Sequence, residues 1–98
     1  MNKKESRLSA IILTKNSVRT VEKCIQSVFQ QTLKPDEVVV VDGNSNDGTL
    51  EIIEKYPILL VTEPGLGYGY ARNIGLNNSR GNTVAFVDSD CVLEQNYF

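Results

Sequence analysis

The chain has 98 residues, of which 41% are hydrophobic and 22% charged, the composition of one globular domain. Ten basic residues against twelve acidic ones give a net charge of −2, which excludes the basic surface typical of nucleic-acid-binding proteins. The sequence has no histidine, which removes most zinc sites and both Ser-His and Cys-His catalysis.

Hydrophobicity along the chain argues against a targeting or membrane segment. The first apolar run, residues 8–13, is too short for a signal peptide, and no run approaches the ~20 residues of a membrane span. We therefore expect a cytoplasmic protein, or one attached peripherally to the inner face of the membrane. Cys24 and Cys91 lie far apart in no metal-binding spacing, and Cys24 on an apolar helical face is typical of a small core residue.

Four apolar runs rich in β-branched residues predict strands at 8–13, 38–41, 58–61 and 83–87. Because the runs are continuous rather than alternating, they are typical of parallel strands buried on both faces. The first gap between them has one apolar stripe, made of Val18, Val21, Ile25, Val28 and Phe29. This stripe predicts a helix, and Asn16 or Ser17 is expected to cap it.

The second and third gaps also have helical patterns. Asp47 or Thr49 is expected to cap a short helix that ends before Pro57. A third helix is predicted from residues that share a face, Tyr70, Ala71, Ile74 and Asn78, with Gly81 as its C-terminal stop. Strands alternating with single helices predict an α/β three-layer sandwich with a mostly parallel sheet.

Polar residues follow every predicted strand, in the segments 14–16, 42–48, 62–63 and 88–90. The carboxyl ends of parallel strands meet at one rim, where ligands bind at the point at which the strand order reverses. The predicted fold therefore brings at least three acidic side chains to one rim.

Asp88 and Asp90 flank Ser89 directly after the fourth strand. Two carboxylates this close repel one another unless a cation lies between them. Oxygen ligands suit Mg²⁺ or Mn²⁺, which typically also bind substrate phosphates, so Asp88-Ser89-Asp90 is a candidate metal bridge to a diphosphate. The alternative is a turn in which one Asp caps the next segment and the other is solvated.

Two other loops match known patterns only in part. Segment 42–48 resembles a calcium loop, but its glycine comes one place late and its twelfth position is Ile53, so an EF-hand is excluded. Asp42 ends an apolar run, where its carboxylate can accept hydrogen bonds from a base or a ribose. Segment 65–70 resembles a dinucleotide fingerprint, yet Tyr70 replaces the third glycine, and the glycines indicate a tight loop near a ligand. Arg72 beyond it is either an exposed helical residue or a phosphate or base contact.

Together these segments resemble the inverting glycosyltransferase family 2, which has the GT-A fold. The matching pieces follow in family order and spacing, at residues 9–16, 27–32, 40–49, 71–75 and 80–90. The resemblance implies a Rossmann-like nucleotide-diphospho-sugar transferase half-domain. The donor-binding residues that it implies are Thr14, Asn16, Asp42, Arg72, Asp88 and Ser89. Asp42 would bind the base, commonly uracil, and Asp88 and Asp90 would bind the divalent metal.

The sequence departs from the family pattern at several of these positions. Leu13 and Lys15 stand where the family usually has Pro and Tyr, which removes the aromatic expected near the base. Gly43 stands where a second Asp often follows Asp42, and Cys91 stands where another Asp commonly follows the metal motif. The nucleotide is therefore less firmly predicted than the metal motif.

The resemblance implies transfer of a sugar from a nucleoside-diphosphate sugar, UDP-linked by expectation, to a hydroxyl of a saccharide, lipid or other acceptor. Because the family domain is larger, we interpret residues 1–98 as its N-terminal nucleotide-sugar-binding portion, truncated before the catalytic base and inactive alone. A homodimer through the surface that the second half normally covers is a further hypothesis. The alternatives are a non-catalytic binding module and a nucleotidyltransferase, which normally has a glycine-rich basic loop where this chain has residues 14–17.

Overall fold

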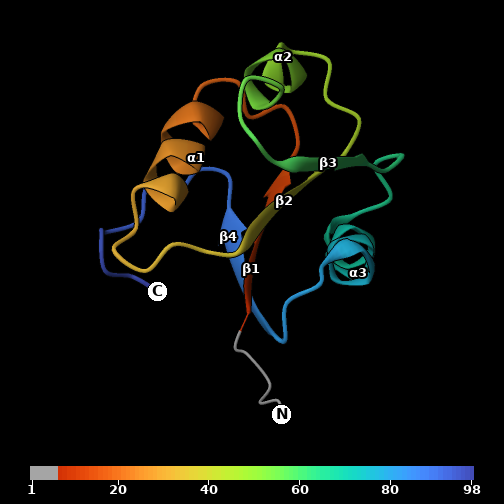
Figure 1. Cartoon of the computed structure of the whole chain (residues 1–98). Coiled ribbons are helices and arrows are strands. Elements are labelled where there is room, and N and C mark those ends of the chain that lie inside the picture. Colours follow the sequence, from red (N-terminus) through yellow and green to blue (C-terminus); the bar gives the residue numbers. More distant parts are fainter. Residues whose placement is uncertain (1–6) are drawn as a thin grey trace.

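The computed structural model describes residues 7–98, which form a four-stranded parallel sheet with helices on both faces (Figure 1). The elements are β1 (Leu8–Thr14), α1 (Val21–Phe29), β2 (Glu37–Asp42), α2 (Thr49–Ile53), β3 (Leu59–Thr62), α3 (Tyr68–Asn78) and β4 (Thr83–Asp88). Their order confirms the predicted alternation of strands and helices. Within the described range, no helix combines the length and hydrophobicity needed to cross a membrane.

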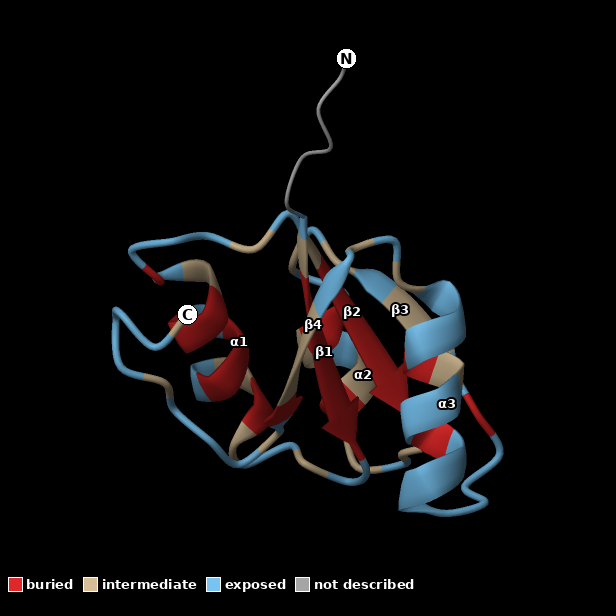
Figure 2. Cartoon of the chain, turned by 90° about the horizontal axis from the view of Figure 1, so that it is seen from below, coloured by how far each residue is buried: buried red, intermediate tan, exposed pale blue. Residues whose placement is uncertain are grey.

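The sheet has the strand order β3-β2-β1-β4, so β1 and β2 are its central strands. Both are buried along nearly their whole length, as their continuous apolar runs predict (Figure 2). The prediction of burial on both faces is wrong for the edges: Leu59 of β3 is 47% exposed, and only Val87 of β4 is fully buried. An edge strand has a neighbour on one side only, so apolar residues there keep part of their contact with water.

Residues of the central strands alternate between two cores, one on each face of the sheet. On one face Ala10 and Ile12 of β1 pack with α1 and α2, and on the other Ile11 and Leu13 pack with Ala71 of α3. Helix α3 approaches the sheet closely because Gly75 faces it, where an added Cβ would lie 2.7 Å from the Cγ2 atom of Ile11. These two cores make the predicted three layers, with α1 and α3 on opposite sides of the sheet (Figure 2).

Helix α1 begins three residues later than its apolar stripe predicts. The carbonyl of Ser17 accepts hydrogen bonds from the amides of Thr20 and Val21, and Val18 is 36% exposed. Neither Asn16 nor Ser17 caps the helix through its side chain, so that prediction is wrong. The reason is tertiary: the Asn16 amide donates to Ser45 Oγ and the Ser17 amide to Thr49 Oγ1, which ties this loop to the one after β2.

The other two helices depart from the predicted pattern at their ends. In α3, Ala71 is buried, but Tyr70 is 42% exposed. The cap position after α3 is Ser79, so the prediction of Gly81 as the stop is wrong. Gly81 is needed elsewhere, because a Cβ there would lie 2.8 Å from the backbone nitrogen of Ser9. At α2, the cap position is Gly48 and no side chain caps the helix, so the prediction of Asp47 or Thr49 as the cap is wrong, although Asp47 Oδ1 accepts from the Thr49 amide at 3.1 Å.

The segment after β4 has no regular structure but is held against α1. Leu93 and Phe98 pack on the core beside that helix. The Gln31 side chain donates to the Glu94 carbonyl at 2.6 Å and accepts from the Phe98 amide at 3.1 Å. These contacts fix the direction in which the chain leaves Asp88, and with it the position of the acidic turn.

Candidate functional site

A cavity of about 680 Å³ lies at the carboxyl ends of the strands. Its walls come from the loop after β1, the first residues after β2 and β3, the start of α3, and the turn after β4. The polar and charged residues among them are Thr14, Lys15, Asn16, Ser17, Arg19, Thr20, Glu63, Tyr68, Asp88, Ser89 and Asp90. The chain passes from β1 to β2 in one direction and returns to β4 on the other side of β1, so the cavity lies where the strand order reverses.

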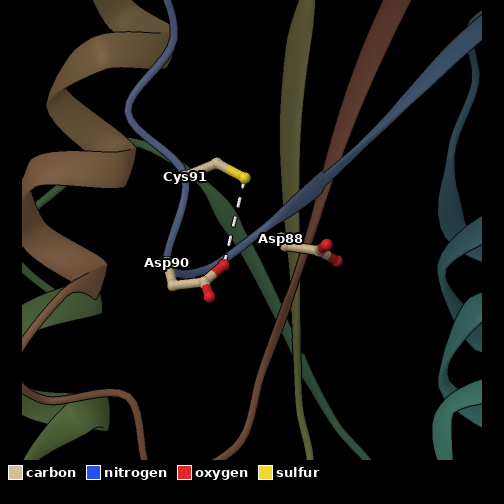
Figure 3. Close-up of side chains that lie close together, drawn as sticks. All are labelled: Asp88, Asp90 and Cys91. Carbon is tan, nitrogen blue, oxygen red and sulfur yellow. Dashed lines mark hydrogen bonds between the residues drawn. The ribbon is translucent and has the colours of Figure 1, made fainter.

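Asp88, Asp90 and Cys91 form an exposed cluster at the β4 end of the cavity (Figure 3). One possible ligand atom from each lies within 4.8 Å of the others. Oxygens on opposite sides of a Mg²⁺ ion are about 4.2 Å apart, so small side-chain rotations bring both carboxylates onto one ion. Carboxylates suit a hard dication, whereas a thiol does not. The two aspartates therefore fit Mg²⁺ or Mn²⁺, with Cys91 as a neighbour.

Hydrogen bonds tie this acidic turn to two other elements. Asp88 Oδ1 accepts from the Tyr68 hydroxyl at 2.8 Å, and the Ser89 and Ser17 hydroxyls lie 2.7 Å apart. The bond to Asp88 raises the pKa of Tyr68, because an ionised phenolate would lose it and face the carboxylate. Tyr68 was missed by sequence reasoning, although its place at the end of a glycine-rich loop before a helix was a usable signal.

Asp42 lies behind the wall of the cavity and is completely buried. Its Oδ1 atom accepts from the hydroxyls of Thr14 at 2.6 Å and Ser45 at 2.7 Å. Its Oδ2 atom accepts from the Ser45 amide at 2.8 Å. In this arrangement the carboxylate joins the loop after β2 to the end of β1, instead of facing the space where a base would lie.

The two predicted residues of the first loop line the cavity, but both make internal contacts. Thr14 is 5% exposed and its hydroxyl donates to Asp42. Asn16 has a left-handed backbone, with φ of 48°, and its side-chain oxygen accepts from the Asn46 amide at 2.9 Å. Their contribution to the wall is therefore a fixed loop shape more than free side-chain donors.

Arg72 is the fifth residue of α3, is exposed, and does not line the cavity. Its guanidinium carbon lies 4.1 Å from the centre of the Phe86 ring and 6.0 Å from that of Tyr68, a cation–π arrangement. Of the predicted site residues, the structure thus gathers Thr14, Asn16, Asp88, Ser89 and Asp90 at the cavity, and leaves Asp42 and Arg72 outside its wall.

Two residues that line the cavity away from the acidic turn, Glu63 and Lys15, were not assigned a role from the sequence. Glu63, directly after β3, is 7% exposed, and its Oε1 atom accepts from the amides of Gly65 at 2.7 Å and Leu66 at 3.0 Å. Lys15 donates from Nζ to the Gly43 carbonyl at 2.7 Å. The signal for Glu63 was the one used for Asp42, an acid that directly follows an apolar strand.

Known proteins are similar to this chain in both sequence and fold. The chain is 38% identical over 98 residues to Glycosyltransferase GlyA of Streptococcus pneumoniae, across 95% of this chain and 14% of GlyA. The crystal structure of Staphylococcus aureus TarS 1–349 in complex with UDP has a TM-score of 0.83 at 34% identity, covering 92% of this chain and 29% of that one. The mannosyltransferase PcManGT from Pyrobaculum calidifontis, in complex with GDP-Man and Mn²⁺, has a TM-score of 0.79 at 30% identity, covering 86% of this chain and 27% of that one.

These coverages show that the chain spans less than a third of each of the three proteins. Residues 9–98 match the family described as Glycosyl transferase family 2, a match that runs through all four strands and the acidic turn. The chain therefore belongs to glycosyl transferase family 2.

Proposed function

We propose that this chain binds a nucleoside-diphosphate sugar in the cavity, with Asp88 and Asp90 holding Mg²⁺ or Mn²⁺ on the diphosphate. The protein to which it belongs would transfer the sugar, with inversion, to a hydroxyl of a saccharide, lipid or other acceptor. The observation that carries the proposal is the pair of exposed carboxylates at the point where the strand order reverses. The complexes of TarS with UDP and of PcManGT with GDP-Man and Mn²⁺ support it.

The protein's own contribution is to place the two carboxylates. Tyr68 fixes one oxygen of Asp88 by donating to it, and the contact between Ser17 and Ser89 fixes the turn between the two acids. The bound dication would act as a Lewis acid that neutralises charge on the departing diphosphate. Holding the ligands before the donor arrives lowers the cost of ordering them during binding.

The structure argues against a nucleotidyltransferase, which needs free amides after the first strand to cradle phosphates. Here the amides of Lys15, Asn16 and Ser17 donate to hydroxyls of the chain itself. A phosphate at this loop would have to break those bonds. A donor-binding module without catalysis remains the alternative, and acceptor-dependent transfer by the protein that contains this chain separates the two.

Calorimetry with UDP, in Mn²⁺ and in EDTA, tests the proposal. We expect UDP to bind with Mn²⁺, and the Asp88→Asn, Asp90→Asn double variant to lose at least about tenfold in affinity, because the ion then lacks its two charged ligands. Glu51→Gln, an exposed acid on α2, is the matched control and should bind like the wild type. Equal UDP affinity in Mn²⁺ and in EDTA, or no UDP binding in either, would contradict the proposal.

A further inference from the structure

We infer that Glu63 recognises the nucleotide base, and that it selects a base with a ring N–H donor, as in uracil or guanine. The inference rests on the proposed function, since it names the base end of the same donor site. The predicted base partner, Asp42, is not part of the cavity wall, whereas Glu63 is.

The two carboxylate oxygens of Glu63 differ in what they contact. Oε1 accepts from two loop amides, those of Gly65 and Leu66, which fixes the orientation of the carboxylate. Oε2 accepts no hydrogen bond from any residue in the described range 7–98, although the side chain is more than nine-tenths buried and lines the cavity. No side-chain nitrogen or oxygen in the described range is both buried and unpartnered, so Oε2 itself is open to the cavity. An acceptor open to a cavity is a place for a donor from a ligand or water.

Gly43 leaves the space that this arrangement needs. A Cβ at position 43 would lie 2.9 Å from Glu63 Oε2, too close for the carboxylate to stay where it is. Any side chain at position 43 would thus occupy the same part of the cavity that the Glu63 carboxylate now enters from β3. The glycine at position 43 and the buried glutamate are therefore one feature: the space above the glycine receives a carboxylate from the neighbouring strand.

The position of Glu63 relative to the acidic turn matches the length of the ligand. Glu63 follows β3 and Asp88 ends β4, at opposite edges of the sheet, with β2 and β1 between them. Three interstrand spacings of about 4.8 Å separate those edges by roughly 14 Å. An extended nucleoside diphosphate covers such a distance, so a diphosphate held at Asp88 and Asp90 directs its base toward Glu63.

The charge of Glu63 decides which bases fit. The N3 atom of uracil and the N1 atom of guanine carry a hydrogen and can donate to Oε2. The N3 atom of cytosine and the N1 atom of adenine are acceptors, which would face a carboxylate acceptor across the same contact. The exocyclic amines of these two bases can donate to a carboxylate, but only if the base shifts from the position in which its ring nitrogen faces Oε2. Once a base covers Oε2, a contact that leaves this acceptor without a donor is disfavoured, typically by a large factor.

The test is calorimetry in Mn²⁺ with UDP, GDP, CDP and ADP, using wild type and Glu63→Gln. In the variant, the position of Oε1 must stay an acceptor for the amides of Gly65 and Leu66, so the new NH₂ group takes the place of Oε2 and becomes a donor. We expect the wild type to prefer UDP or GDP over CDP and ADP by about tenfold or more. UDP against GDP identifies which of the two ring N–H bases the cavity accepts. Glu63→Gln should bring the ratio of UDP to CDP affinity down by at least about tenfold.

Gly43→Ala is the second variant, because its methyl group displaces the Glu63 carboxylate without removing it. We expect it to reduce the preference for UDP or GDP while Mn²⁺-dependent binding persists, and Glu51→Gln to leave every ratio unchanged. Metal-dependent binding of all four nucleotides with equal affinity, or a ratio that neither variant shifts, would overturn the role of Glu63 and leave the donor site intact. Failure of every nucleotide to bind with Mn²⁺ would overturn the proposed function itself.

Discussion

The two ends of the cavity hold their acidic side chains in opposite ways. Asp88 and Asp90 at the β4 end are exposed, and each carboxylate receives a single side-chain hydrogen bond, from Tyr68 and from Cys91. Asp42 and Glu63 at the β2 and β3 ends are buried and accept three and two hydrogen bonds. A buried charge is stabilised by the hydrogen bonds that it accepts, so Asp42 and one oxygen of Glu63 organise loops, while Asp88 and Asp90 stay available to a cation.

The largest effect that we expect is on the free energy of unfolding, and it tests whether the buried and the exposed acids differ in their contribution to stability. We expect Asp42→Ala to lower the free energy of unfolding by about 3 kcal/mol, because the hydroxyl of Thr14 and the amide and hydroxyl of Ser45 lose a charged acceptor. Asp90→Ala should change it by less than about 0.5 kcal/mol, since that side chain is exposed. Urea denaturation measures both, and similar values for the two variants would show that burial does not separate the two kinds of acid.

We expect a smaller loss of stability from substitution of Glu63, because its side chain accepts hydrogen bonds from one short loop, the one between β3 and α3. Glu63→Ala should lower the free energy of unfolding by about 1–2 kcal/mol, because the amides of Gly65 and Leu66 lose their acceptor. Hydrogen exchange should then quicken at these two amides and stay unchanged in β1. Exchange that quickens equally throughout the sheet would mean that Glu63 supports the whole fold and not this loop.

The smallest effect that we expect is a difference in reactivity between the two thiols, because Cys24 is buried and Cys91 is exposed. Burial in the core, together with the smaller effects of the nearby Cys91, Asp90 and Asp88, raises the pKa of Cys24 to about 12. At pH 8 about one Cys24 in ten thousand is then a thiolate, the form that reacts. Iodoacetamide should therefore modify the exposed Cys91 alone in the native protein, and both cysteines in urea, as counted by mass spectrometry. Rapid native modification of Cys24 would show that the acidic turn opens.

Patterns of residue type were enough to predict most of the architecture. Continuous apolar runs rich in β-branched residues identify all four strands, although only the central strands β1 and β2 are covered on both faces. Single helical segments between them require parallel pairing, which brings the strand ends to one rim. The position of the acidic turn at Asp88 and Asp90 follows from this, since the backbone that directly follows a parallel strand lies at that rim.

What the sequence by itself determined is therefore the order of the elements, the parallel sheet and the position of the acidic turn at Asp88 and Asp90, because each depends on residues close together in the chain. Only the tertiary structure decided which strand-end acid faces the cavity. Asp42 and Glu63 have the same local signature, but Thr14, 28 positions before Asp42, turns that carboxylate inward, and the space above Gly43 receives the carboxylate of Glu63. The extent of burial at β3 and β4 was likewise set by their position at the sheet edges, which depends on the strand order.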